Sequence, residues 1–183
     1  MAKTEEPTIK GVFVMSHVHA LKKAKGKTAV AELERRYGHA ISFGATQNVP
    51  IREEVKIIEL TLDILTGDTT PKEKRAYEAG KLHFNNFTQT PLGMMLFPLF
   101  TSNFKMLLMK SPTIAQQVFR GVTFKSEDLD RNCVRITMEN NDYPLGHFQG
   151  FFYAWLTYSD LFGDVDAKEQ GRNCYIYTIS WSA

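Results

Sequence analysis

The sequence predicts one α+β domain, in which a mainly helical region precedes a small antiparallel sheet of about four strands packed on helices. Apolar residues recur every three or four positions over most of residues 9–120, as in helices buried on one face. After Gly121 they recur at every second position, as in strands, apart from one aromatic helical segment over 145–162. Residues 121–183 are therefore predicted to form a β-β-α-β-β module.

The N-terminal region is expected to start with a flexible segment, residues 1–8. The apolar run at 9–14 suits a short strand or an extended segment. Two helices are predicted next, over 17–25 and 27–37, with Gly26 between them. Glycine favours a break there because it costs about 1 kcal/mol relative to alanine inside a helix.

The following helix is predicted to have Pro50 in its first turn, where proline is favoured. Glu53 and Glu54 suit the positive end of the helix dipole, and Gly67 ends the helix. Its apolar stripe consists of Val55, Ile58, Leu62 and Leu65. The two neighbouring glutamates thus have a structural explanation, and the sequence assigns them no catalytic role.

A further helix is predicted to start at Thr70 and Pro71 and to reach about Phe87. Threonine would cap the first turn, and proline lacks the amide hydrogen that would otherwise need a partner there. His83 lies on the apolar stripe of this helix, next to Phe84. The sequence leaves two roles open for His83, a half-buried structural histidine or a ligand of haem iron.

The capping signal recurs at Thr90 with Pro91 and at Ser111 with Pro112. Two short helices, broken near Pro98 and Thr101, are predicted between these points, and another over 112–120. The first two helices are rich in methionine, leucine and phenylalanine. Such side chains occur in ordinary cores, at subunit interfaces and in pockets for apolar ligands, and helical spacing does not distinguish these uses.

Alternating apolar residues predict two hairpins around the aromatic helix in the C-terminal module. The strands of the first hairpin are expected at 122–124 and 134–138, on either side of a turn-rich segment. The helix over 145–162 is expected to end at Gly163. The second hairpin is predicted from strands at 164–169 and 173–181.

The composition of the chain narrows the classes of protein to which it can belong. With 43% apolar residues the chain can bury one continuous core, and we expect residues 1–183 to form a single domain. A formal charge of +2 gives no general attraction to nucleic acid. The apolar run Pro91–Phe100 is far shorter than the roughly 20 residues of a membrane span. The N-terminus lacks the pattern of a secretory signal, so a cytoplasmic location with free thiols at Cys133 and Cys174 is expected.

No residue spacing amounts to a catalytic or metal-binding signature. His17 and His19 would lie on different faces of a helix, and neither His39 nor His147 has an accompanying ligand in sequence. The sequence has neither a Gly-x-Ser-x-Gly motif nor a phosphate loop. It therefore predicts a non-enzymatic protein without a metal site.

The C-terminal part, NNDYPLGHFQGFFYAWLTYSDLFGDVDAKEQGRNCYIYTISW, resembles the closing module of a known superfamily. This superfamily groups 4-vinyl reductase domains, subunits of the TRAPP tethering complex and haem nitric-oxide-binding domains. The shared features are the Pro144 turn, the small and aromatic residues Gly150–Phe152, Gly163, and the Cys174–Tyr175 region in the last strand.

The whole chain also resembles an uncharacterised family that is expanded as paralogues in myxobacteria. The matching segments are Lys10–Phe13, Pro50–Glu54 and Glu139–Pro144. The superfamily resemblance implies an α+β fold, often dimeric, with a hydrophobic cavity between helices and sheet for ligand sensing or protein docking. Haem-binding members use a helical histidine and a Tyr-x-Ser-x-Arg motif for the propionates, and this sequence contains no such motif.

Together these observations predict a non-enzymatic sensory or adaptor domain, expected to be a homodimer. It would hold a small apolar ligand, or apolar side chains of a protein partner, between the methionine-rich helices and the aromatic helix. The candidate pocket residues are Phe84, Phe87, Met94, Met95, Phe97, Phe148, Phe152 and Trp155. The alternatives are a homodimeric scaffold without a ligand and a haem sensor that uses His83. No cofactor is required by the leading prediction, and haem or a lipid are the candidates for one.

Overall fold

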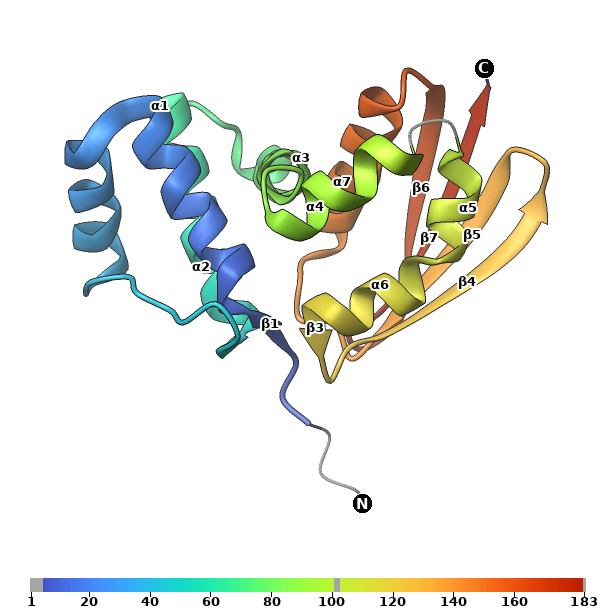
Figure 1. Ribbon diagram of the computed structural model, residues 1–183, viewed down its shortest axis with the longest axis horizontal. Coiled ribbons are helices and arrows are strands. Elements are labelled where there is room, and N and C mark those ends of the chain that lie inside the picture. The colour runs from blue at the N-terminus through green and yellow to red at the C-terminus, as the bar shows by residue number, and fades with distance from the viewer. Residues whose placement is uncertain (1–4, 101–102, 183) are drawn as a thin grey trace.

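The computed structural model describes residues 5–100 and 103–182, without the side chains of 97–100. It confirms the α+β class: helices dominate the N-terminal part, and an antiparallel four-stranded sheet closes the chain (Figure 1). No helix in the described ranges combines the length and the apolar character needed to cross a membrane.

The N-terminal part starts from a small three-stranded sheet of order β2-β1-β3. The elements of this part are β1 (Thr8–Lys10), α1 (Gly11–Tyr37), β2 (Asn48–Pro50), α2 (Ile51–Thr66) and β3 (Phe119–Arg120). The two predicted helices form α1, which is interrupted at Gly26 by a backbone with φ 81° and ψ −175°. The predicted extended run at 9–14 ends already at Lys10.

Helix α1 starts earlier than predicted because Gly11 packs against the loop before β2. A Cβ at Gly11 would lie 2.3 Å from the carbonyl oxygen of Gly44, so only glycine fits there. Pro50 ends β2, and α2 starts at the next residue. Gly67 ends α2 as predicted, with φ 64°.

The central helices are α3 (Arg75–Phe87), α4 (Pro91–Phe100), α5 (Phe104–Met109) and α6 (Ser111–Val118), and a 3-10 turn, η1 (Lys72–Lys74), precedes α3. The predicted cap at Thr70 is wrong, because its hydroxyl donates to Thr66 Oγ1 at 3.1 Å and the chain enters α3 through η1. The predicted cap at Thr90 is confirmed, since its hydroxyl accepts from the Gly93 amide at 3.2 Å.

The C-terminal module has the predicted β-β-α-β-β order. Its elements are β4 (Thr123–Asp130), β5 (Cys133–Glu139), α7 (Leu145–Tyr158), β6 (Phe162–Gly171) and β7 (Cys174–Ser182), with strand order β4-β5-β7-β6. Helix α7 ends four residues before the predicted end, because the chain turns at Asp160 with φ 54°. Cys133 and Cys174 are free and half-buried.

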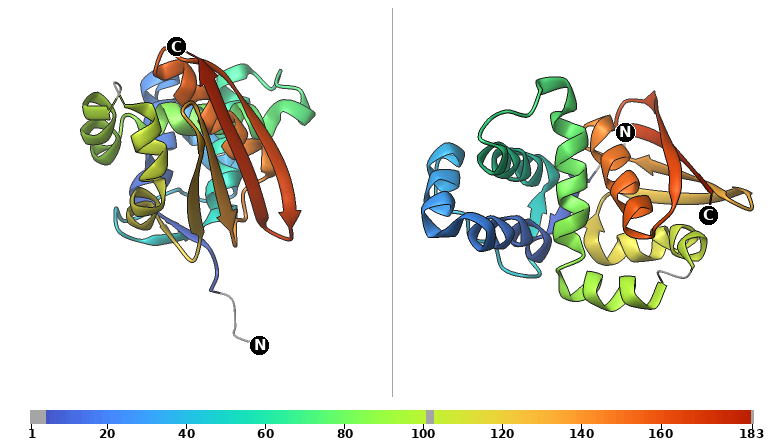
Figure 2. Two further views of the ribbon diagram at one scale, coloured as in Figure 1. Left: turned by 90° about the vertical axis from the view of Figure 1, so that its right-hand side faces the viewer. Right: turned by 90° about the horizontal axis from the view of Figure 1, so that it is seen from above.

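Helices α3 and α7 join the two parts of the molecule. Figure 2 shows α3 between the α1–α2 pair and α7, with the sheet beyond α7. Gly80 of α3 and Gly150 of α7 allow the two backbones to touch: a Cβ at Gly80 would lie 1.7 Å from the His147 carbonyl oxygen, and one at Gly150 would lie 1.9 Å from the Tyr77 carbonyl oxygen. Helix α7 also contacts β6 and β7, and the Tyr177 hydroxyl donates to the Leu145 carbonyl at 3.1 Å.

Candidate functional site

Five polar side chains from four helices meet in the interior of the protein. His17 comes from α1, Glu54 from α2, His83 and Asn86 from α3, and His147 from α7. Each is at most 5% exposed. Burying polar groups costs free energy unless they find partners inside the protein. We therefore take this polar cluster as the candidate functional site.

The small N-terminal sheet brings the first two members of the polar cluster together. Helix α1 starts directly after β1, helix α2 starts directly after β2, and these two strands pair with each other. His17 in the second turn of α1 and Glu54 in the first turn of α2 therefore lie close to the same sheet. His83 and Asn86 are three residues apart on α3 and share its face toward them.

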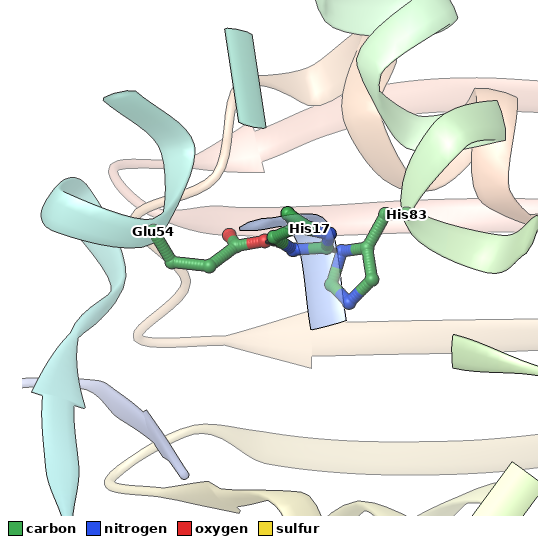
Figure 3. A group of neighbouring side chains, drawn as sticks. All are labelled: His17, Glu54 and His83. Atoms are coloured by element: carbon green, nitrogen blue, oxygen red, sulfur yellow. Dashed lines mark hydrogen bonds and ion pairs between the residues drawn. The ribbon is translucent and has the colours of Figure 1, made fainter. Parts of the chain in front are cut away.

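Short contacts connect the members of the polar cluster. His17 Nε2 lies 2.6 Å from Glu54 Oε1, and His17 Nδ1 lies 2.9 Å from the Asn86 amide nitrogen. His83 Nδ1 lies 2.9 Å from His147 Nε2 and 3.6 Å from Glu54 Oε1. Figure 3 shows the Glu54 side chain reaching from α2 toward the rings of His17 and His83.

The electrostatics of the polar cluster give its members different charges. Burial acts to raise the pKa of Glu54, but the imidazoles of His83 and His17 outweigh it and lower that pKa to about 2. Burial lowers the pKa of His83 to about 4 and the pKa of His147 to about 3. At neutral pH the glutamate is therefore an anion, and these two histidines are neutral.

Several buried polar atoms at this site have no hydrogen-bond partner among the described residues. They are Glu54 Oε2, His147 Nδ1 and the hydroxyl of Tyr143, a residue whose ring lies 4.5 Å from that of His147, when only hydrogen bonds of good distance and angle are counted. Burial, the negative charge of Glu54 and a weaker hydrogen bond from the Tyr143 hydroxyl to that carboxylate raise the pKa of Tyr143 well above its ordinary value. Unpaired groups are rare inside proteins and call for an explanation such as a water or a bound ion.

The donor set suits a metal ion. One donor atom each from His17, Glu54 and His83 lies within 4.8 Å of the others, and all three residues are buried. Neutral imidazoles with a carboxylate are ligands of zinc and of other divalent transition metals. The residues that could hold such an ion are therefore these three.

A second feature, the apolar pocket, lies beside the polar cluster. Its volume is about 60 Å³, and it lies between α3, α7, the short helices α5 and α6, and the start of the sheet. His83 lies in its wall, and Ser111 is the other polar residue of the described lining. The Ser111 hydroxyl has no hydrogen-bond partner among the described residues. His83 thus belongs to both the pocket and the polar cluster.

The structure brings together four of the residues that the sequence suggested for a pocket. Phe87, Phe148, Phe152 and Trp155 line the apolar pocket. Phe84 is fully buried but packs its ring against Phe151 and Trp155 and is not part of the lining.

The three remaining candidates come from α4. Met94 and Met95 are each 58% exposed and do not line the apolar pocket. The side chain of Phe97 lies outside the described part of the structure. Among the side chains of α4 that the structure describes, Leu96 lines the pocket.

Most of the polar cluster is missed by reasoning on the sequence. The sequence places His17 beside His19, which is exposed, and the helix dipole accounts for Glu54. His147 had no ligand near it in sequence because its neighbours come from other helices. One local signal did exist: His83 and Asn86, three residues apart, are polar residues on a helix face that also carries Phe87.

Comparison with known proteins places the chain in a family and a fold. Residues 2–182 match the family described as "Protein of unknown function (DUF2378)". No curated protein matches the chain. Several solved structures do, although their sequences are only 12–15% identical to this chain.

The similar structures are H-NOX domains. A mutant H-NOX of T. Tengcongensis aligns with a TM-score of 0.67 and 14% identity, covering 95% of this chain and 98% of that one. An H-NOX structure determined to probe haem distortion aligns with a TM-score of 0.69, 13% identity and 95% coverage of both chains. An oxygen-binding H-NOX domain related to soluble guanylate cyclases aligns with a TM-score of 0.62, 15% identity and 95% coverage of both chains. At this identity the likeness establishes a shared fold.

Proposed function

We propose that this chain, which belongs to the DUF2378 family, is a non-enzymatic sensory or adaptor domain that binds a small apolar ligand in the apolar pocket. The observation that carries the proposal is a pocket of about 60 Å³ whose described lining is apolar except for His83 and Ser111. Apolar cavities stay dry and take up apolar guests, whereas polar cavities hold water. The likeness to H-NOX domains, one of which binds oxygen, supports a small ligand.

The pocket volume limits the size of the ligand. Sites for drug-sized molecules measure about 300–1,000 Å³, several times the volume of this pocket. A ligand of a few heavy atoms fits it, whereas a lipid chain needs the surrounding helices to move apart. The unpaired Ser111 hydroxyl could hydrogen-bond to one polar atom of such a ligand.

The residues at the pocket do not fit haem. No charged side chain occurs in the described lining, so none is present to pair with the propionates. We therefore do not adopt the haem alternative, and we expect no Soret band after expression with a haem supply.

The proposal is tested with xenon as the probe. In NMR spectra of the protein in xenon-saturated buffer, we expect shifts of the methyl groups of Leu107, Ala115 and Val118, which line the pocket. The methyl groups of Ile58 and Leu62 belong to a separate hydrophobic cluster and should not move. Equal shifts at both sets, or none at the pocket, would contradict the proposal.

A pair of variants controls this experiment. Ala115→Leu adds a branched side chain at the pocket wall and should abolish the xenon-induced shifts. Ala24→Leu makes the same change at an exposed position of α1 and should leave the shifts as they are in the wild type.

The wider resemblance suggests further roles, which stay predictions. It concerns TRAPP subunits, 4-vinyl reductase domains and myxobacterial paralogues. Binding of a protein partner stays a prediction as well.

A further inference from the structure

We propose that His17, Glu54 and His83 form a binding site for one divalent transition-metal ion, with zinc as the simplest occupant. This site goes beyond the proposed function, because it lies in the polar cluster and does not require a ligand in the apolar pocket. Two observations carry it: the convergence of three buried donor residues and the unpaired buried atoms around them.

The measured distances between the donor atoms lie on either side of the ligand-to-ligand spacing around a zinc ion. Zinc binds nitrogen and oxygen ligands at about 2.0–2.2 Å, so its ligand atoms stand about 3.3 Å apart in a tetrahedron. His17 Nε2 and Glu54 Oε1 are 2.6 Å apart, and Glu54 Oε1 and His83 Nδ1 are 3.6 Å apart. The third pair of donor atoms, on His17 and His83, lies within 4.8 Å. Side-chain shifts of about 1 Å would bring the three atoms to the spacing of a zinc site.

The charge of the polar cluster favours a cation. Within the described part of the chain, the ion-pair partners of Glu54 are the two histidines His17 and His83, with no lysine or arginine among them. A buried carboxylate without a full countercharge costs free energy, and a divalent ion would offset this cost. Glu54 Oε2, fully buried and without a hydrogen bond of good geometry, offers the ion a second carboxylate oxygen.

The surrounding residues suit the role of a second shell. Histidines that bind metals usually donate their other ring N–H to an oxygen, which fixes the orientation of the ring. The Asn86 amide lies 2.9 Å from His17 Nδ1, and turning this amide over places its oxygen there to accept that N–H. His147 Nε2 lies 2.9 Å from His83 Nδ1, a contact that would give way to the metal if His83 bound it through Nδ1.

The polar cluster lies next to a groove on the surface. A surface groove of about 460 Å³ lies between α1 and the end of α3, and Asn86 forms part of its wall. Asn86 also contacts His17, so this side chain links the wall of the groove to the proposed site. A metal site needs an entry path as well as ligands.

The test is a titration of the full-length chain after treatment with a chelator. We expect one Co²⁺ per chain, with visible absorption bands, and its displacement by one Zn²⁺ in calorimetry. NMR should show that the side-chain signals of His17 and His83 move on addition of Zn²⁺. If the wild-type chain binds neither ion, or if these signals do not respond, the proposal is overturned.

Variants locate the site. Glu54→Gln and His17→Gln should each weaken Zn²⁺ binding by at least about 100-fold, and Asn86→Ala by about 10- to 100-fold. His39→Gln removes an exposed histidine far from the polar cluster in sequence and should leave the affinity unchanged. Loss of binding in His39→Gln but not in Glu54→Gln would place the ion elsewhere and overturn the proposal. Should a buried variant not fold, the wild-type titration and its NMR signals still decide.

The xenon and metal experiments test the two proposals separately. Xenon binding without metal binding refutes only the metal site, and metal binding without xenon binding refutes only the proposed function.

Discussion

At the scale of single residues, the interior of this protein buries several polar groups next to aromatic rings. His83 contacts His147 through Nδ1, and its ring also packs edge-on against Phe151 at 5.4 Å. Because the described surroundings hold these rings away from water, protonation of His83 and His147 is unfavourable. The metal-free protein should therefore be sensitive to acid.

The first prediction concerns this pH dependence. The folded-state pKa values of His83 and His147, about 4 and about 3, lie below the ordinary value of 6.5. Below pH 6.5 the unfolded chain therefore binds more protons than the folded chain. The stability that these histidines contribute is complete above about pH 6.5 and is lost as the pH falls toward 4 and 3. Each histidine adds a slope of up to about 1.4 kcal/mol per pH unit.

This slope is measured by urea unfolding in the presence of a chelator at several pH values. His147→Gln should reduce the slope between pH 4 and 6.5, because one of the two groups no longer titrates. His39→Gln, at an exposed position, should not change it. An unfolding free energy that stays flat from pH 7 to 4 in the wild type would contradict the prediction.

At the scale of elements, α3 is the helix that connects every feature described above. One of its faces supplies His83 and Asn86 to the polar cluster, while Phe87 lines the apolar pocket. Its contact with α7 depends on Gly80 and Gly150, at which the two backbones meet. The position of His147 relative to His83 is therefore set by how closely these helices approach.

The second prediction tests this close approach. In Gly80→Ala the new Cβ would lie 1.7 Å from the His147 carbonyl oxygen, so α7 must move away from α3. We expect a loss of about 1–3 kcal/mol or more in the free energy of unfolding, measured with urea. The same variant should shift the NMR signals of the His83 and His147 rings.

Gly146→Ala is the matched control on α7. Its Cβ would lie 3.5 Å from the Ala76 Cβ, an ordinary contact, and alanine suits a helix better than glycine. We expect its stability to stay within about 1 kcal/mol of the wild type, on the stabilising side. Equal effects of the two alanines would show that the helices are not packed as closely as described.

At the scale of the whole molecule, the helical part and the sheet share one hydrophobic core. A continuous cluster of buried side chains includes Leu21 and Ile57 in the helical part and Val134 and Ile179 in the sheet. A domain with one such core usually unfolds in a single cooperative step. The single domain stays a prediction, and its unfolding behaviour tests it.

The third prediction is therefore a single unfolding transition. Tryptophan fluorescence reports on Trp155 and Trp181, both in the C-terminal module, whereas far-UV circular dichroism is dominated by the helices of the N-terminal part. Urea transitions followed by the two signals should coincide. Two separate midpoints would instead indicate two folding units.

The homodimer also stays a prediction. Light scattering of the same samples measures the molar mass in solution and checks it.

Much of the fold could be predicted because its signals are local. The change of hydrophobic period after Gly121, the glycine at the break in α1 and the threonine cap of α4 all act within a few residues of the chain. The failed cap at Thr70 shows the limit of this reasoning, since a neighbouring threonine competed for its hydroxyl. Four of the eight predicted pocket residues line the apolar pocket, because aromatic side chains on the inner faces of α3 and α7 point toward the same core.

By itself, the sequence determined the α+β class, the order of the elements and the aromatic nature of the interior, since side-chain periodicity and turn chemistry are properties of short segments. Only the tertiary structure decided that His17, Glu54 and His83 meet, and that Met94 and Met95 face solvent. The members of the polar cluster come from separate helices, and their distances depend on strand pairing and on two helices touching at glycines. No spacing along the chain encodes such contacts, so a glutamate that suits the start of a helix becomes, in three dimensions, the charged centre of the site.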